Sequence, residues 1–294
     1  MTVARVPHHF TVDVEESFQV SAMEPFVMRS DWDSFPSRVD RGTRMVLELL
    51  RAAGSTGTFF VLGWIAERHP ALVREIIDAG HEVASHGYGH ERVTTINPGK
   101  FRESVRSSKA ILEAITGSPV LGYRAPSFSI IRGGEWALDT LVEEGYQYDS
   151  SLYPVRRSGY GYAGGRRDPH DITLADGVLR EYPPATLGIG SAVLPAGGGA
   201  YFRHLPYQVV ERALIQSGQR GESATFYIHP WELDTEEPRI AVPFKTRMRH
   251  YGAVSRTTPR LRRMLARFQF QSIATSLAAA RCEAGGIASS APAP

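Results

Sequence analysis

Short apolar strands alternate with amphipathic helices along almost the whole 294-residue chain, and this alternation constrains the fold more than any other feature. Strands are expected at residues 8–14 and 56–62. A helix is expected between them at 40–53, where apolar residues recur at helical spacing before Gly54. Such alternation is typical of a parallel sheet whose strands are connected by helices. We therefore predict an α/β fold with either an open sheet or a closed (β/α) barrel.

The alternation continues toward the C-terminus, with one break in the middle. Residues 153–176 hold several glycines and arginines, and we expect a long loop there. Residues 283–294 are small and rich in proline, so we predict a disordered tail after one domain that spans residues 1–282. The other strands are expected at residues 82–85, 120–123, 147–149, 179–182, 224–229 and 268–273. The other helices are expected at residues 70–79, 98–116, 134–144, 206–216, 259–267 and 274–281.

Charge and cysteine content exclude several classes of protein. The 33 basic and 31 acidic residues give a net charge of +2, which does not indicate a nucleic acid partner. The single cysteine, Cys282, excludes an intramolecular disulfide framework and a cysteine-rich zinc module. The first residues lack the apolar stretch of about 7–15 residues that a secretory signal needs, and no segment approaches the roughly 20 apolar residues of a spanning helix. We therefore expect a cytoplasmic protein, either free or peripheral to the inner face of the membrane.

Titratable side chains stand at the carboxyl ends of five predicted strands. In a (β/α) barrel these ends meet on one face, where the chemistry of such folds takes place. Chance would seldom put titratable groups at so many strand ends, so the sequence predicts one shared site. The residues are Asp13, Glu15, His86, His90, Arg124, Asp149 and His229.

Two histidines and a group of acids in this set suit a divalent metal ion. His86 and His90 lie four residues apart with two glycines between them, so a loop is expected there rather than a helix. Neutral histidine nitrogens and one carboxylate bind zinc and similar metals and leave a position for water. In an extended chain Asp13 and Glu15 point to one side and Glu16 to the other. Alternatively, the histidines belong to the core or the surface, and the acids begin a helix.

Two further side chains suit acid–base chemistry. His229 ends a strand and precedes a proline, and because histidine titrates near neutrality it suits a general acid. Arg124, in the sequence YRAPS, is suited to orient a carboxylate by bidentate pairing. The structural alternatives are a strand-end histidine without a catalytic role and an arginine in a surface salt bridge.

Together, five motifs resemble those of the polysaccharide deacetylase family, also called the NodB-homology domain or carbohydrate esterase family 4. They read TVDVEE, SHGYGH, RAPS, YDSS and IHPWE in the family's order, and the resemblance covers roughly residues 8–275. The sequences FYIHPWE and GGGAYFRHLPY are most similar to the subgroup associated with exosortase and exopolysaccharide gene clusters. The resemblance implies a distorted (β/α) barrel of the NodB-homology type that forms a single catalytic domain.

The resemblance also implies a role for each matching residue. Asp13 corresponds to the general base and Arg124 to the arginine that orients it. His229 corresponds to the general acid, and Asp149 to the carboxylate that pairs with this histidine. The chain departs from the family pattern at two positions, Val14 and Gly87, where the family usually has a metal-binding aspartate and a serine or threonine. The implied ligands of a divalent metal, with zinc expected, are His86, His90 and Glu15, with Glu16 as the alternative to Glu15.

The activity implied by the resemblance is hydrolysis of N-acetyl groups on N-acetylhexosamine units of a polysaccharide or lipid-linked glycan. Metal-activated water would attack the acetamide carbonyl, with the aspartate as base and the histidine as acid. One alternative is a cyclic-amide or ureide hydrolase of the allantoinase-like branch of this fold, which would release no acetate. Another is a non-catalytic glycan-binding protein, which the complete set of titratable residues argues against.

A basic stretch and three aromatic side chains bear on substrate and partners. From Arg239 to Arg281 there are nine arginines, one lysine and no acidic residue. These charges either lie on solvated helix faces or dock on a phosphate-bearing lipid carrier or an anionic membrane surface. Tyr153, Phe202 and Trp231 are candidates to stack on sugar rings, and packing in the core is the alternative.

Overall fold

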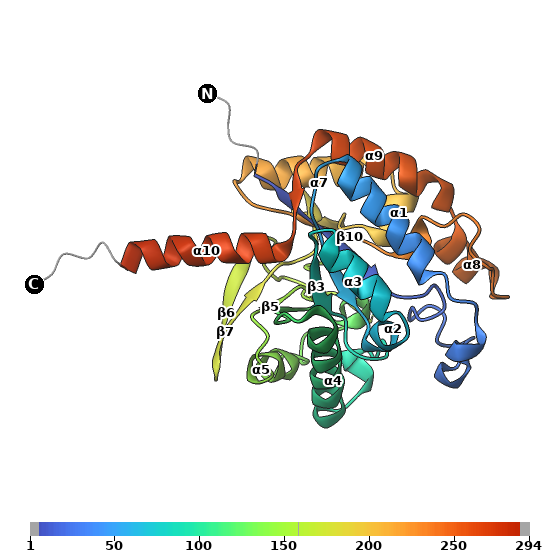
Figure 1. The fold of residues 1–294 in the computed structure, drawn as a ribbon. Helices are drawn as coiled ribbons and strands as arrows, with labels where there is room; N and C mark the ends of the chain where they lie inside the picture. Colours follow the sequence, from blue (N-terminus) through green and yellow to red (C-terminus); the bar gives the residue numbers. More distant parts are fainter. Residues whose placement is uncertain (1–5, 158, 289–294) are drawn as a thin grey trace, which may run out of the picture.

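A mainly parallel, nine-stranded sheet forms the centre of the computed structural model, which describes residues 6–157 and 159–288 (Figure 1). The strand order is β10-β1-β2-β3-β4-β5-β7-β6, with β11 also paired to β1, and β6 runs antiparallel to β7. The sheet curls but leaves β10 and β6 as separate edges, so the predicted (β/α) barrel is confirmed in a distorted, incompletely closed form. The strands are β1 (His8–Val14), β2 (Thr58–Val61), β3 (Glu82–Ser85), β4 (Gly122–Tyr123), β5 (Tyr148–Asp149), β6 (His170–Leu174), β7 (Gly177–Glu181), β10 (Thr225–Ile228) and β11 (Phe270–Gln271).

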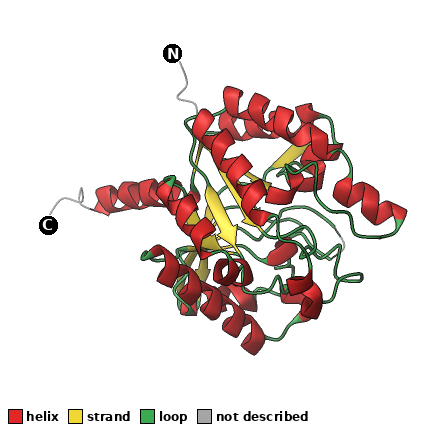
Figure 2. Cartoon of the chain, turned by 45° about the vertical axis from the view of Figure 1, so that its right-hand side comes forward, coloured by secondary structure: helices red, strands yellow, loops and turns green. Residues whose placement is uncertain are grey.

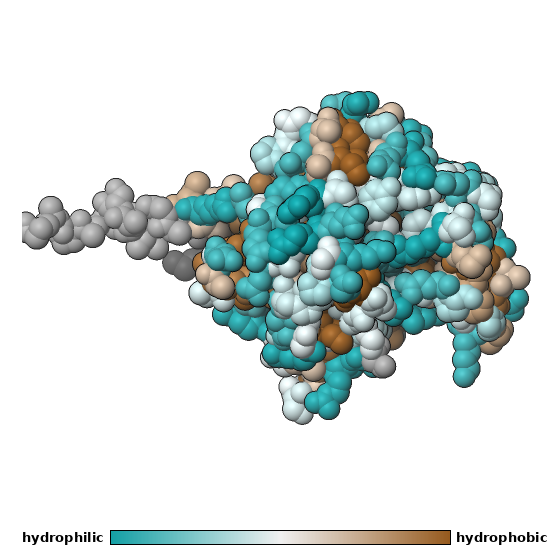
Figure 3. All heavy atoms as spheres, turned by 90° about the horizontal axis from the view of Figure 1, so that it is seen from below, coloured by the Kyte–Doolittle hydropathy of each residue, from teal (hydrophilic) through white to brown (hydrophobic). Residues whose placement is uncertain are grey.

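Helices surround this sheet, and one of them, α10, extends away from the body on the side opposite to α8 (Figures 1 and 2). Within the parts of the chain that the structure describes, no helix is both long and apolar enough to cross a membrane. On the face seen in Figure 3, hydrophobic residues lie in separate patches among hydrophilic ones. The helices are α1 (Val39–Ala52), α2 (Gly63–Arg68), α3 (Pro70–Asp78), α4 (Pro98–Thr116), α5 (Trp136–Glu143), α6 (Gly199–His204), α7 (Tyr207–Gln219), α8 (Phe244–Tyr251), α9 (Thr257–Arg267) and α10 (Ile273–Ala288).

Strand β1 shows how the sequence separates the hydrophobic core from the polar interior of the barrel. All seven of its residues are buried, and successive side chains point to opposite faces of the sheet. Phe10 and Val12 pack in the main hydrophobic core. Thr11 and Asp13 lie on the other face, where the side-chain oxygen of each accepts a hydrogen bond from Arg124. One face of the strand therefore stabilises the fold, and the other supplies polar groups.

The carboxyl ends of the central strands lie side by side. Val14 pairs with Val61, Val61 with Ser85, Ser85 with Tyr123, and Tyr123 with Asp149. The residues that follow these positions therefore emerge together at one edge of the sheet. This register brings residues that are more than a hundred positions apart in sequence to one place.

Four elements in the middle of the chain are not predicted by the sequence pattern. The expected loop at residues 153–176 ends in β6, an edge strand whose residues are all at least partly exposed, so no apolar run marks it. Strands β8 (Thr186–Ile189) and β9 (Ala192–Pro195) form a separate two-stranded sheet. Helix α6 begins at Gly199, the third residue of a run of three glycines that by itself is typical of a turn.

The prediction of a disordered tail from residue 283 is partly wrong. Helix α10 continues through residues 283–288, because a helix that has formed over the alanine-rich residues before them propagates more readily than it starts. The rest of the predicted tail, residues 289–294, lies outside the described residues.

Candidate active site

Four strands deliver the predicted titratable residues to one edge of the sheet. Glu15 follows β1, His86 follows β3, Arg124 follows β4 and His229 follows β10. His229 Nε2 lies 3.4 Å from Glu15 Oε1 and 3.9 Å from Asp13 Oδ2. The structure therefore brings the N-terminal acids and the C-terminal histidine to one place.

Glu15, His86 and His90 form a buried group whose geometry fits a metal ion. One ligand atom from each lies within 4.8 Å of the other two. Glu15 Oε2 is 3.0 Å from His90 Nε2 and 3.7 Å from His86 Nε2. The same oxygen is buried and has no hydrogen-bond partner among the described residues. A buried acceptor in this state costs free energy unless a cation or a hydrogen-bond donor binds it. Two imidazole nitrogens and one carboxylate are a donor set that zinc and similar divalent metals accept.

The backbone fixes His86 in the form that a metal requires. His86 Nδ1 donates a hydrogen bond to the carbonyl oxygen of Arg124 at 2.8 Å, which leaves Nε2 with its lone pair facing Glu15. Burial lowers the pKa of His86 to about 3, so its ring is neutral. Between the two histidines the chain reverses through Gly87, whose φ of +74° suits glycine and explains the departure from serine or threonine. His90 itself has a φ of +57°, a conformation that costs a non-glycine residue free energy.

The alternative third ligand, Glu16, lies in a different environment. Its carboxylate accepts hydrogen bonds from the backbone N–H groups of Arg38 and Val39 at 3.2 Å and from the hydroxyl of Ser37. Glu16 therefore caps the start of α1. Because β1 side chains alternate, Val14 packs in the core and Glu15 is the acid that reaches the two histidines.

Arg124 is completely buried and holds Asp13. Its Nη1 donates to Asp13 Oδ1 at 2.7 Å and to Thr11 Oγ1 at 2.8 Å, and its Nη2 donates to Ser150 Oγ at 2.8 Å. The guanidinium lies over the ring of Phe60 at 4.1 Å. One nitrogen rather than two contacts the aspartate, so the expected bidentate pairing is wrong, because the second nitrogen is directed to Ser150. Arg124 nevertheless compensates the buried charge of Asp13 and fixes its direction.

His229 is oriented by a residue that the sequence analysis missed. Its Nδ1 lies 2.5 Å from Glu232 Oε1, and Glu232 Oε2 accepts a hydrogen bond from Arg203 Nε at 2.5 Å. Arg203 also donates to the carbonyl oxygens of His250 and Gly252 at 2.7 Å, beside the end of α8. Glu232 and Arg203 are buried, so a chain of charged groups runs from the histidine into the protein.

These charges determine the protonation of His229. Burial alone would lower its pKa, but the carboxylates of Glu232, Glu15 and Asp13 outweigh that effect and raise the pKa to about 9. Burial would raise the pKa of Glu232, but Arg203 and His229 lower it to about 2. The arrangement therefore holds a proton on the imidazole and a negative charge on its partner.

Asp149 does not occupy the place that the resemblance implies. Its Oδ1 accepts a hydrogen bond from Ser151 Oγ at 2.6 Å, and its Oδ2 accepts one from Ser151 N at 3.1 Å. The same serine oxygen accepts from the backbone N–H of Ala125 at 2.8 Å. Burial raises the pKa of Asp149 and, together with the charge of Asp149, that of the neighbouring Glu181. The implied pairing with His229 is wrong, because Asp149 turns into its own loop and supports the backbone after β4.

The three aromatic candidates for sugar stacking are all buried. Tyr153 packs against Phe128 and Tyr227, and its hydroxyl accepts a hydrogen bond from the backbone N–H of Gly197 at 3.0 Å. Phe202 belongs to the main hydrophobic core. Tyr153 and Phe202 are therefore wrong as exposed stacking surfaces, because the apolar interior takes them.

Trp231 has a different role in the site. It is buried, and its ring stacks on His229 with ring centroids 5.2 Å apart and an interplanar angle of 21°. The Trp231 ring also stacks on His250, with ring centroids 4.2 Å apart. Trp231 therefore positions the imidazole of His229 from the side, whereas the predicted stacking on a sugar ring would need an open face.

Two family models match separate segments of the chain. Residues 28–136 match the model described as polysaccharide deacetylase. Residues 150–278 match a model described as a domain of unknown function, DUF3473. The first segment contains His86, His90 and Arg124, and the second contains His229 with Glu232.

Curated relatives align with part of the chain. The chain is 32% identical over 120 residues to the peptidoglycan deacetylase-like protein FGM2 of Gibberella zeae, covering 40% of this chain and 34% of that protein. It is 31% identical over 113 residues to the peptidoglycan deacetylase of Helicobacter pylori, covering 38% and 37%. It is 30% identical over 105 residues to the peptidoglycan-N-acetylmuramic acid deacetylase PdaA of Bacillus subtilis, covering 36% and 39%. The chain thus spans little more than a third of the length of these relatives.

Solved structures share the fold over most of the chain. A Mycobacterium smegmatis protein described as a polysaccharide deacetylase superposes with a TM-score of 0.62 at 19% identity, covering 96% of this chain and 93% of that one. Puue allantoinase superposes with a TM-score of 0.57 at 20% identity, covering 78% and 79%. At these identities the comparison establishes the fold alone.

Proposed function

The chain belongs to the polysaccharide deacetylase family through residues 28–136, and on that basis we propose that it is a metal-dependent N-deacetylase. Its substrate is an N-acetylhexosamine unit of a polysaccharide or lipid-linked glycan, and one domain at residues 1–282 carries the activity. The observation that carries the proposal is the convergence of His229 on Asp13 and Glu15, beside the two buried histidines His86 and His90. The relatives' names, which describe deacetylases of peptidoglycan and chitooligosaccharide, support a glycan substrate.

Glu15, His86 and His90 are the residues that would hold the cation. Two imidazoles and one carboxylate suit zinc among the divalent cations. When bound, such a cation would lower the pKa of water and polarise the acetyl carbonyl. The neutral state of His86 and the unpartnered oxygen of Glu15 support this assignment.

Asp13 and His229 divide the proton transfers between them. Asp13 accepts a proton from the attacking water, while Arg124 keeps the carboxylate in position. As oxygen bonds to the acetyl carbon, the C–N bond breaks and the amine needs a proton. His229 donates that proton from Nε2, because Glu232 holds Nδ1 and stabilises the protonated ring. The products are acetate and a free amino sugar.

The test is acetate release by protein stripped of metal with a chelator and then supplied with Zn²⁺. N-acetylated oligosaccharides serve as substrates, and His86→Ala treated in the same way is the blank. Metal-dependent acetate above this blank supports the proposal. Firmly bound metal without acetate, together with opening of a cyclic amide or ureide, would favour the allantoinase-like alternative.

We also propose an anionic membrane surface as a partner, with α8 as the docking element. Phe244 and Met248 lie one helical turn apart and are 65% and 48% exposed. Exposed cations at Lys245, Arg247 and Arg249 lie on the same helix, and basic groups beside exposed apolar ones suit an anionic bilayer.

Vesicle sedimentation tests this partner. The protein should sediment with phosphatidylglycerol vesicles more than with phosphatidylcholine vesicles, and Phe244→Ser should lower the bound fraction several-fold. The matched control is Val178→Ser, which removes a residue that is 57% exposed on β7. Equal binding of both variants, or no binding by the unmodified chain, would leave α8 as a solvated helix face.

A further inference from the structure

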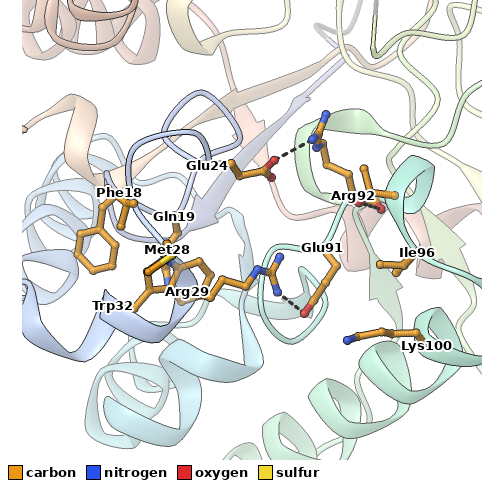
Figure 4. Close-up of a pocket in the computed structure, with 12 residues that line it drawn as sticks. Phe18, Gln19, Glu24, Met28, Arg29, Trp32, Glu91, Arg92, Ile96 and Lys100 are labelled. Carbon is orange, nitrogen blue, oxygen red and sulfur yellow. Dashed lines mark hydrogen bonds and ion pairs between the residues drawn. The ribbon is translucent and has the colours of Figure 1, made fainter. Parts of the chain in front are cut away.

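A pocket of about 510 Å³ lies beside the site, between the segment that follows β1 and the segment that follows His90 (Figure 4). This volume is within the range of pockets that bind small molecules. Gln19, Met28 and Arg29 belong to one wall, and Arg92, Ile96 and Lys100 to the other. This cavity is the side pocket.

Residues that line the side pocket contact or directly follow residues of the candidate site. Gln19 Oε1 accepts a hydrogen bond from the backbone N–H of Glu16 at 2.8 Å, directly after Glu15. On the opposite wall, Glu91 is the next residue after His90. A Cβ on Gly89 would stand 3.0 Å from Arg29 Nη1, so this arginine packs against the loop that carries both histidines. An occupant of the side pocket would therefore lie against the two segments that follow Glu15 and His90.

Two hydrogen-bond donors on the walls have no partner. Gln19 Nε2 and Arg92 Nε are buried and make no hydrogen bond among the described residues. The amide oxygen of Gln19 is already engaged, so its remaining capacity is donation alone. A buried hydrogen-bond donor without a partner costs free energy. A ligand whose oxygen accepts a hydrogen bond from that donor removes this cost.

The charges around the side pocket do not cancel. Arg29 pairs with Glu91, and Arg92 Nη2 lies 2.7 Å from Glu24 Oε2. Lys100 extends from the start of α4 into the space between the walls and has no ion pair within the described ranges (Figure 4). Three cations against two carboxylates leave one positive charge, which favours a ligand with one negative charge.

We infer that the side pocket is a subsite for a carboxylate-bearing sugar unit adjacent to the unit that is deacetylated. This inference rests on the proposed function and adds a preference for acidic glycans. Lys100 and the amide of Gln19 bind the carboxylate, and Met28 and Ile96 offer apolar contact to the sugar ring. A single uncompensated cation with a neutral donor matches a singly charged carboxylate better than a doubly charged phosphate.

The test compares two oligosaccharides that differ only in whether their acidic units carry a carboxylate. A hyaluronan hexasaccharide alternates N-acetylglucosamine with a carboxylated sugar, and its carboxyl-reduced form carries a neutral hydroxymethyl group instead. Their affinities are measured by calorimetry on zinc-loaded protein in the His229→Ala background, so that the ligand is not consumed. We expect the acidic form to bind about five- to tenfold more tightly at low ionic strength.

Variants then assign this preference to the side pocket. Lys100→Gln removes the free cation, and Gln19→Glu replaces the unpaired donor with a carboxylate oxygen while keeping the acceptor for Glu16. Both should reduce the affinity ratio toward one. Lys245→Gln removes an exposed lysine on α8 and should leave the ratio unchanged.

The outcomes separate this inference from the proposed function. Equal affinities of the two oligosaccharides, absence of binding by the acidic one, or an equal loss in Lys245→Gln would overturn the subsite. A preserved preference for the acidic form would support it even if the unmodified chain released no acetate. Acetate release from a neutral N-acetylated oligosaccharide in turn tests the deacetylase, because that substrate carries no carboxylate for the side pocket to bind.

Discussion

The two sides of the site are built in different ways. On the metal-ligand side, Glu15, His86 and His90 come from the ends of β1 and β3, and the backbone carbonyl of Arg124 fixes one histidine. On the acid side, charged side chains do the positioning, because His229 contacts Glu232 and Glu232 contacts Arg203. The metal ligands are therefore assembled by the strand register and the loop after β3, whereas the general acid depends on α6 and the end of α8.

The largest expected effect contrasts two neighbouring acids. Glu15→Gln should lower metal affinity by more than about 100-fold, because losing even a residue that only orients a ligand costs about 10–100-fold. Glu16→Gln should keep the metal and lower the free energy of unfolding by about 1 kcal/mol, since it weakens the cap on α1. Metal analysis of both variants after dialysis checks this. Loss of metal in Glu16→Gln alone would exchange the two assignments.

A smaller effect is expected on the acid side. Glu232→Gln should leave metal content unchanged and shift the alkaline limb of the pH–rate profile toward lower pH by about one unit or more. The sign follows because the Glu232 carboxylate raises the pKa of His229, and a general acid works only while it is protonated. An unchanged alkaline limb would show that Glu232 does not set the protonation of the acid.

The smallest effect is expected at Asp149, the carboxylate that the motif comparison assigns to His229. Asp149→Asn should leave the alkaline limb where it is, because this side chain contacts Ser151 rather than His229. Its effect should fall on thermal stability, since the carboxylate holds a buried loop. A shift as large as that of Glu232→Gln would restore the implied pairing.

The sequence predicts well what the backbone alone determines. The bounds of β1 and β3 and the positions of Glu15, His86 and Arg124 at strand ends follow from local patterns. The contacts of Glu16 could not be predicted, because they depend on where α1 begins. An acidic residue is common both as a helix cap and as a metal ligand, so the residue type alone does not tell the role of Glu16 from that of Glu15.

Features that depend on tertiary contacts were harder to predict. Glu232 stands three residues after His229, and this spacing with a proline between them is a signal that the sequence contains. Arg203 has no such signal, because it reaches Glu232 only after α6 packs on β10. Tyr153 and Phe202 were misassigned because an aromatic residue in a glycine-rich segment has the same sequence pattern whether it faces solvent or the core.

One experiment tests most directly whether the two sides are separable parts of one active centre. Bound zinc and acetate release are measured on the same preparations of the unmodified chain, His86→Ala and His229→Ala. The account predicts that His86→Ala loses both, and that His229→Ala keeps its zinc while acetate release falls by about 10²–10⁴-fold. Full zinc content in His86→Ala, or undiminished acetate release by His229→Ala, would contradict it.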